Sequence, residues 1–413
     1  MSKLRGLNPL VLFSVSPFLD GYLTVAAGFV IFKLLTADSA SAWDVSLFAG
    51  SFIFGTVLGA FFVGRCADRV GRRTMARWTL LPAMVASALG FFTEMPMVLV
   101  TAQLLLGMAI GADQPISQAL VTELSPETVR KKRLTVLMLN WYVGALVAVA
   151  VDFAVRPDIQ GAVKAGWSVY YLLPLCLTGV AWLQRWALLE GEGRQEMRSA
   201  MIAERRNLLS PEYRQPFLFC CGFWACQAIP VSVVMYYVPA FLAELLGRQT
   251  GMWQVPLLYL FFLLGTLPML SPRISGRPMK VLQWTFVVMG AGLLGVSFFA
   301  NEALLSVSLL MYALAYGMQS SLDNIFPNLL FPESIRATAV STIFAFIRVL
   351  SAMTALWGAG GLYYSGHGAL FGIFVDKASI GLENCFPRAP VMYGQFLGKV
   401  FAFLYQSRKR DLT

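Results

Sequence analysis

Apolar residues run along this chain in long stretches separated by polar loops. Each stretch holds about 20 residues, the length that an α-helix needs to cross the hydrocarbon core of a bilayer. A membrane β-barrel would alternate apolar and polar residues along each strand, which these stretches do not. We therefore predict an all-α polytopic membrane protein with crossings at residues 9–31, 44–64, 75–93, 97–123, 134–155, 167–189, 216–244, 254–272, 279–300, 303–326, 338–361 and 390–406.

The twelfth predicted crossing differs in character from the other eleven. It is short and carries Lys399, and it follows an irregular polar segment at residues 364–388. Residues 361–413 are therefore atypical of the rest of the chain. This change suggests a replaced C-terminal part, so a partly degraded protein is an alternative to an intact one.

The distribution of charge predicts the orientation in the membrane. The chain has a formal net charge of +10, but only 13% of its residues are charged. The cations gather in alternate loops, with clusters at residues 65–77, 130–133 and 185–214, the last of which begins with Arg185. The positive-inside rule then predicts a cytoplasmic N-terminus and a multi-pass protein of the cell inner (plasma) membrane. We expect the lipid bilayer, and not nucleic acid, to be the surrounding partner.

A polar stretch at residues 189–215 divides the chain into two halves of six crossings. We predict an N-terminal half at residues 1–188, a cytoplasmic linker at 189–215 with short surface helices, and a C-terminal half at 216–413. The loops at residues 71–73 (GRR) and 276–278 (GRP) echo each other. Two related halves around a central site are typical of transporters that rock between two states.

The loop at residues 64–73 reads GRCADRVGRR. Positive-inside anchoring explains its arginines, but neither Gly71, which suits a backbone of positive φ, nor Asp68. The loop resembles the G-x-x-x-D-r-x-G-R-[RK] signature of the major facilitator superfamily. The resemblance implies a cytoplasmic latch that stabilises the outward-facing state, formed here by Gly64, Asp68, Arg69, Gly71 and Arg72.

Three further segments resemble the sugar-porter and metabolite–proton symporter branches of that superfamily. They are residues 107–130, which end in ELSPETVR with Glu123 and Arg130 in the latch positions, residues 226–237 (CQAIPVSVVMYY) and residues 331–337 (FPESIRA). Gln227 and Tyr236 keep the places of a sugar-binding pattern. Cys226, Pro230 and Ser232 depart from it, so hexose is not the expected substrate.

Acidic residues within the crossings are candidates for substrate or proton binding, because an unpaired charge in the bilayer costs at least about 2.5–3.5 kcal/mol. Asp20 lies in the first crossing, where it is either a proton carrier or an acid neutralised by a neighbour. Asp113 lies in the fourth. Asp323 and Asn324 near the end of the tenth either line the cavity or cap the helix.

Two positions bear on how Asp20 could be neutralised. The superfamily commonly has an arginine in the fourth crossing, where this chain has Gln103. Arg348, in the eleventh crossing, could replace it as the partner of Asp20 or could bind an anionic substrate. Trp141 and Tyr142 in the fifth crossing suit a small organic ligand, although packing is the commoner fate of such aromatics.

The resemblance implies a secondary transporter of a small polar metabolite, with proton-coupled uptake by alternating access, acting as a monomer. The candidate pathway residues are Asp20, Asp113, Gln227, Tyr236, Asp323 and Arg348. A membrane enzyme is disfavoured because the single histidine, His367, and six cysteines without metal-ligand spacing form no catalytic or metal site, and no cofactor is expected. A non-transporting remnant or sensor is the other alternative.

Overall fold

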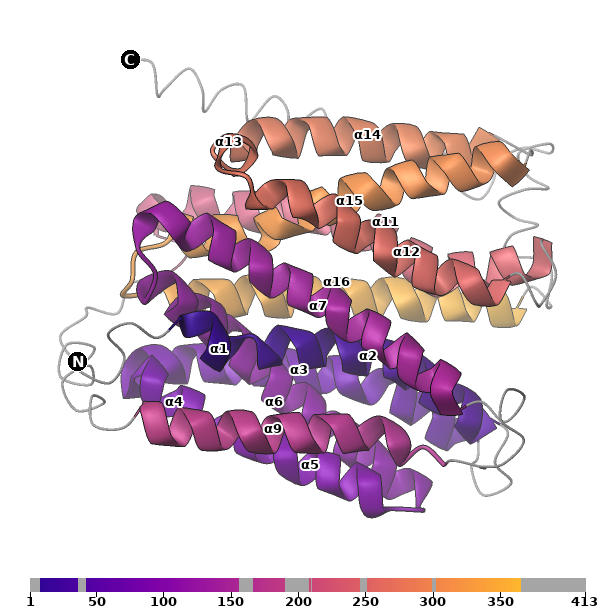
Figure 1. The fold of residues 1–413 in the computed structure, drawn as a ribbon, viewed down its shortest axis with the longest axis horizontal. Coiled ribbons are helices and arrows are strands. Elements are labelled where there is room, and N and C mark those ends of the chain that lie inside the picture. Colours follow the sequence, from indigo (N-terminus) through magenta and orange to yellow (C-terminus); the bar gives the residue numbers. More distant parts are fainter. Residues whose placement is uncertain are drawn as a thin grey trace.

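The fold is a bundle of long helices (Figure 1) in a computed structural model that describes residues 8–35, 42–155, 166–189, 208, 210–245, 251–298 and 302–364. These residues contain no strand. The α-helices are α1 Pro9–Phe13, α2 Val15–Leu35, α3 Ala42–Val70, α4 Arg72–Trp78, α5 Leu80–Phe92, α6 Pro96–Glu123, α7 Glu127–Val155, α9 Val169–Leu188, α11 Pro211–Leu245, α12 Gly251–Thr266, α13 Pro272–Ser275, α14 Pro278–Phe298, α15 Glu302–Leu330 and α16 Arg336–Tyr364, and a 3-10 turn, η1, spans Leu267–Leu270.

Eleven of the predicted crossings are confirmed as helical segments. The first is α1 with α2, the third is α4 with α5, and the eighth is α12 with η1. The twelfth, and most of the linker, lie outside the described residues, so the division into halves stays a prediction. By length and hydropathy, six described segments qualify as membrane spans: Pro9–Ile31, Arg72–Phe92, Pro96–Glu123, Glu127–Val155, Ala303–Leu330 and Arg336–Met353.

The turn between α3 and α4 depends on Gly71. Its φ is 102°, a conformation that a residue with a Cβ adopts only with strain, and it is the one positive φ among the described residues. The predicted positive φ is confirmed. This turn lies, with the loops before α7 and α16, at the arginine-rich end of the bundle, which we call the basic end.

Large apolar side chains cover the outside of the bundle, as lipid requires. Phe92 is 77% exposed, Trp284 70% and Met353 62%. A few charged side chains are buried within the bundle, among them Asp113 and Arg185, which are both 0% exposed. The apolar outer surface agrees with the composition of the chain and with a bundle that faces lipid.

The helices pack in two groups that meet along a few of them. In the first group α2 packs on α7, α3 on α6, and α5 on both α6 and α9, with α1 and α4 also against α6. In the second, α15 packs on both α12 and α14, and α11 on α16. Between the groups, α3 contacts α16, and α7 contacts α12 and α15. Figure 1 shows α7, of the first group, and α16, of the second, where the two groups meet.

Helices α2 and α7 touch backbone to backbone at two glycines. A Cβ on Gly21 would lie 1.9 Å from the carbonyl oxygen of Trp141, and one on Gly144 would lie 2.0 Å from that of Phe18. Only glycine permits this approach. The contact matters for function because it places Trp141 beside Asp20, the neighbour of Gly21.

We predict that Gly21→Ala lowers the free energy of unfolding by about 1–3 kcal/mol, because the added methyl forces the two helices apart. Gly28→Ala is the matched control on the same helix, since a Cβ there meets nothing within 4 Å. Thermal unfolding of purified protein, followed by tryptophan fluorescence, measures both. Equal stability of the two variants would contradict the close packing.

Candidate functional site

An ion pair between Asp20 and Arg348 joins the two groups of helices. Asp20, on α2, is 1% exposed, and a guanidinium nitrogen of Arg348, on α16, donates to its Oδ2. Trp141 Nε1 donates to the same oxygen at 2.8 Å. The guanidinium also lies 4.8 Å from the ring centroid of Phe344, a cation–π contact. A charge on each side of the interface is therefore neutralised by the other.

This geometry makes Arg348 the partner of Asp20. Gln103, at the position where the superfamily commonly has an arginine, instead accepts a hydrogen bond from the hydroxyl of Tyr171 on α9 at 3.1 Å. The other oxygen of Asp20, Oδ1, is buried and has no hydrogen-bond partner among the described residues. A proton or a ligand donor could occupy that position.

A row of aromatic side chains extends from this pair across α7, α12 and α15. We call it the aromatic cluster; its members are Trp141, Tyr142, Tyr259, Phe262 and Tyr316. Neighbouring ring centroids are 4.9–6.4 Å apart. Tyr316, which contacts Phe262, also interacts electrostatically with Arg348.

Polar contacts continue from the aromatic cluster along α15. The hydroxyl of Tyr142 donates to Ser320 Oγ at 2.9 Å, and Asn324 Nδ2 donates to the carbonyl of Leu134 at 3.3 Å. Both contacts join α7 to α15, so they cross between the two groups of helices. Asn324 thus lies buried inside α15 and does not cap its end.

Asp323 and Gln227 form a second polar pair, between α15 and α11. The amide nitrogen of Gln227 donates to Asp323 Oδ1, and the Gln227 side chain is 0% exposed. The structure thus brings together two residues that sequence motifs placed in separate segments. The side chain of Tyr236, also on α11, lies outside the described residues.

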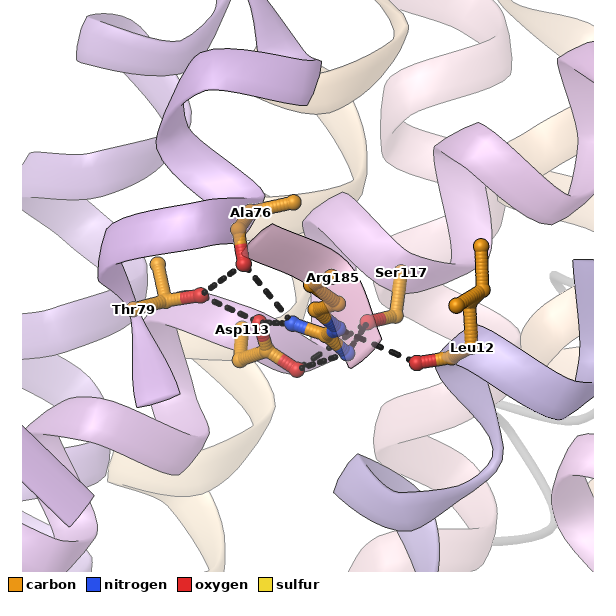
Figure 2. A network of polar contacts seen from close by, with 6 residues as sticks. All are labelled: Leu12, Ala76, Thr79, Asp113, Ser117 and Arg185. Atoms are coloured by element: carbon orange, nitrogen blue, oxygen red, sulfur yellow. Dashed lines mark hydrogen bonds and ion pairs between the residues drawn. The ribbon is translucent and has the colours of Figure 1, made fainter. Parts of the chain in front are cut away.

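Asp113 belongs to a different network, built around Arg185 of α9 (Figure 2). Arg185 Nη2 donates to Asp113 Oδ2 at 2.9 Å, and Nη1 donates to the other carboxylate oxygen. Thr79 also donates to Asp113, and Ser117 does so at 3.0 Å. Both oxygens of Asp113 are therefore occupied.

The same guanidinium also caps backbone groups of two other helices. Its Nε donates to the carbonyl of Leu12 at 3.0 Å, and Nη1 donates to that of Ala76 at 3.1 Å (Figure 2). Arg185 thus ties α1, α4, α6 and α9 together. The assignment of Arg185 to a basic loop is corrected, because the side chain is 0% exposed. A role for Asp113 in the pathway stays a prediction.

A third network lies at the basic end and again crosses between the groups. Glu123, at the end of α6, accepts from Arg72 and, at 3.1 Å, from Arg336 at the start of α16. Arg72 also donates to the carbonyl of Glu333. We call these four residues the basic-end network. Arg336 and Glu333 are members that the sequence motifs alone did not assign to the latch.

The other predicted latch residues are placed less completely. Gly64, Asp68 and Arg69 lie in the last turns of α3, and the side chains of Asp68 and Arg69 lie outside the described residues. Arg130 Nε donates to the carbonyl of Ser125 at 3.3 Å, so it braces the loop between α6 and α7. This loop carries the E-x-x-P-x-x-x-R match.

Comparisons with known proteins agree on one family. Residues 10–356 match the profile of the Major Facilitator Superfamily. The chain is 29% identical to YaaU of Escherichia coli (strain K12), named as a metabolite transport protein, over 81% of both chains. It is 24% identical to the inner membrane metabolite transport protein YgcS of the same organism, over 81% of this chain and 80% of that one.

Solved structures share the fold. The proton:xylose symporter XylE of E. coli, bound to 6-bromo-6-deoxy-D-glucose, superposes with a TM-score of 0.74. The match covers 97% of this chain and 95% of that one, at 16% sequence identity. At that identity the likeness establishes the architecture and leaves the ligand to be argued from the side chains of this protein.

We predict that Arg185→Met lowers the free energy of unfolding by about 3–5 kcal/mol, because it leaves the Asp113 carboxylate buried without a cation to neutralise it. Combining it with Asp113→Leu should recover part of the loss, since the isolated charge is then gone. Chemical or thermal unfolding of the single and double variants tests this.

The control for these variants is Arg273→Gln, which removes an exposed arginine of α13. Its stability should match that of the unaltered protein. A double variant whose loss equals the sum of the two single losses would show that the two residues do not act as a pair.

Proposed function

The chain belongs to the major facilitator superfamily, a family of transporters, and we propose that it imports a small polar metabolite together with protons by alternating access. The observation that carries this proposal is the Asp20–Arg348 pair, because it is an ionisable contact between the two groups of helices. Rocking of the groups against each other would have to separate the pair. Separation without neutralisation would leave two charges in a low-dielectric interior.

Asp20 is the proposed proton carrier. A carboxylate can become neutral by taking a proton, whereas a guanidinium stays charged at any physiological pH. The free Oδ1 of Asp20 offers a place for that proton. Protonation would remove the attraction to Arg348 and leave Trp141 as the remaining partner, so proton binding would loosen the contact between the groups.

We place the basic end on the cytoplasmic side of the cell inner membrane, following the positive-inside rule. The basic-end network would then hold the cytoplasmic side closed, and its opening would release the substrate inward. The related proteins named for metabolite transport support a metabolite as cargo. A monomer suffices for this scheme, since both groups of helices come from one chain.

Two alternatives compete with this function. A remnant or sensor would bind or move no metabolite, and a membrane enzyme would need a nucleophile and a base that converge on one site. Several of the buried polar contacts, among them Asp20–Arg348 and Tyr142–Ser320, cross between the two groups of helices, as a transport pathway between them requires. A transporter is therefore the better supported reading.

The first test is a thermal-shift screen of the purified protein over sugars, carboxylates, aromatic acids and phosphates. A ligand at a concentration 100 times its Kd should stabilise the native state by about 2.7 kcal/mol. The compounds that bind are then tested for uptake into proteoliposomes with and without a proton gradient. A protein that binds and moves no compound would be a remnant or sensor.

We predict that Asp20→Asn abolishes the dependence of uptake on the proton gradient, because the amide cannot carry a proton. Exchange of substrate between the two sides should continue. The measurement is substrate-driven proton movement in proteoliposomes, with Arg273→Gln as the control. Proton-coupled uptake that persists unchanged in Asp20→Asn would remove Asp20 from the mechanism.

We predict that Glu123→Gln opens the basic end more often, because it removes the negative charge that Arg72 and Arg336 share. Cys220, which is 0% exposed in the core at this end, should then react several-fold faster with N-ethylmaleimide. Exposed Cys66 provides an internal control that should react at the same rate in both proteins. Mass spectrometry locates the adducts, and an unchanged rate at Cys220 would argue against a latch.

A further inference from the structure

We propose that the substrate is a carboxylate carried on a flat ring, and that its carboxylate replaces Asp20 on Arg348 while Asp20 holds the transported proton. This inference rests on the proposed function and specifies its substrate class and its order of events. It starts from the charges of the described interior. Arg348 is a cation at the interface, and its acidic partner belongs to the protein itself.

The first step is a balance of charge. An anion that approaches Arg348 while Asp20 is ionised would place two carboxylates on one guanidinium in a low-dielectric site. A proton on Asp20 neutralises one of the two carboxylates, so that one negative charge again faces the one positive charge of Arg348. Transport of one monoanion with one proton is then neutral overall. The site has no net charge when it is empty, with Asp20 ionised, and none when it holds the anion and the proton.

The second step concerns the geometry of the guanidinium. Its planar fork binds a carboxylate through two parallel hydrogen bonds, a mode that a neutral amide or hydroxyl group cannot reproduce. The Arg348 side chain is 18% exposed, compared with 1% for Asp20, so the arginine is the more accessible member of the pair. Contact with Phe344 holds the guanidinium in place when Asp20 is neutral.

The third step is the shape of the ligand. The aromatic cluster runs from the Asp20–Trp141 contact to Tyr316 and consists of five rings, three of which also carry a hydroxyl group. Flat rings gain by stacking or by edge-to-face contact with such side chains. A sugar needs many hydrogen bonds, and Gln227, the retained residue of the sugar-binding pattern, already donates to Asp323.

A buried amide on the same face of α15 supports a ligand with a polar substituent. Gln319 is 0% exposed, and neither Oε1 nor Nε2 has a hydrogen-bond partner among the described residues. It precedes Ser320 and lies one turn from both Tyr316 and Asp323. Buried amides are nearly always satisfied in native proteins, so this donor and acceptor are available to a hydroxyl group or ring nitrogen of the ligand.

The titration is assigned to Asp20 because the other charged groups around α2 are engaged elsewhere. Among the described helices packed on α2, Asp113 of α6 pairs with Arg185 of α9, and Asp152 of α7 accepts from Tyr170 at 2.7 Å. The remaining charged residues of those helices lie near helix ends: Asp44, Arg65, Asp68, Arg69, Glu123, Glu127, Arg130, Lys131, Lys132 and Arg133. The tyrosines near α2, Tyr22, Tyr142 and Tyr171, stay neutral over the pH range of the test.

The test compares three probes on the full-length purified protein: benzoate, benzamide and cyclohexanecarboxylate. Benzamide keeps the ring and removes the charge, and cyclohexanecarboxylate keeps the charge and removes the flat ring. Calorimetric titration at pH 5.5 and pH 8 should show benzoate binding at least tenfold more tightly than either analogue. It should also show weaker benzoate binding at pH 8, because binding is coupled to the uptake of one proton and protons are scarcer at the higher pH.

Two substitutions of the same ion pair should act in opposite directions. Asp20→Asn should bind benzoate at pH 8 as well as at pH 5.5, because the competitor for Arg348 is gone. Arg348→Gln should lose benzoate binding at both values, and Arg348→Lys should weaken it about tenfold by losing the fork. Arg273→Gln should behave as the unaltered protein, and unfolding temperatures measured without ligand verify that each variant is folded.

Several results would overturn the inference. Equal binding of benzamide and benzoate would remove the charge requirement, and equal binding of cyclohexanecarboxylate would remove the ring. If Asp20→Asn and Arg348→Gln change benzoate affinity in the same direction, the pair is only a structural contact. A neutral metabolite taken up with protons would reject this substrate class and leave the proposed function standing, whereas a protein that moves nothing would reject the function itself.

Discussion

The interior of this bundle is governed by the cost of leaving a charge in hydrocarbon without a partner. Each ionised group there costs at least about 2.5–3.5 kcal/mol at the bilayer centre unless another group neutralises it. The Asp20–Arg348 and Asp113–Arg185 pairs and the basic-end network around Glu123 all satisfy this constraint. Since each pair joins particular helices, the choice of partner decides which helices stay together.

The two interior pairs differ in what they join. Asp113 and Arg185 both lie in the first group of helices, and they are surrounded by further partners from that group. Nothing in a rocking motion requires them to separate, so this network suits a rigid body. Asp20 and Arg348 lie in different groups, as do Glu123 and Arg336. These contacts must break in any motion of one group against the other, which makes them the sites where a proton or a ligand can control it.

Sequence patterns predicted the helices well and the pairing of charges poorly. Continuous apolar runs fixed eleven crossings within a few residues, and the φ of Gly71 followed from its place in a tight loop. Arg185 was misassigned because an arginine near the end of a crossing looks like a topology signal. Its partner, Asp113, is 72 positions away, and only the three-dimensional arrangement of the helices, with α5 packed on both α6 and α9, could reveal the pair. Arg348 was recognised as a candidate, but two roles fitted it equally.

The replacement at Gln103 becomes understandable once the pairs are known. A cation at that position would lie in the same group of helices as Asp20. Protonation of Asp20 would then weaken a contact inside the first group and would not act on the contact between the two groups. Here Gln103 is bound to Tyr171, and the cation stands on α16 in the second group. Under the proposed coupling, a proton on Asp20 therefore acts directly on a contact between the groups. In this chain the Asp20–Arg348 pair would both bind the proton, through Asp20, and form the contact that must open.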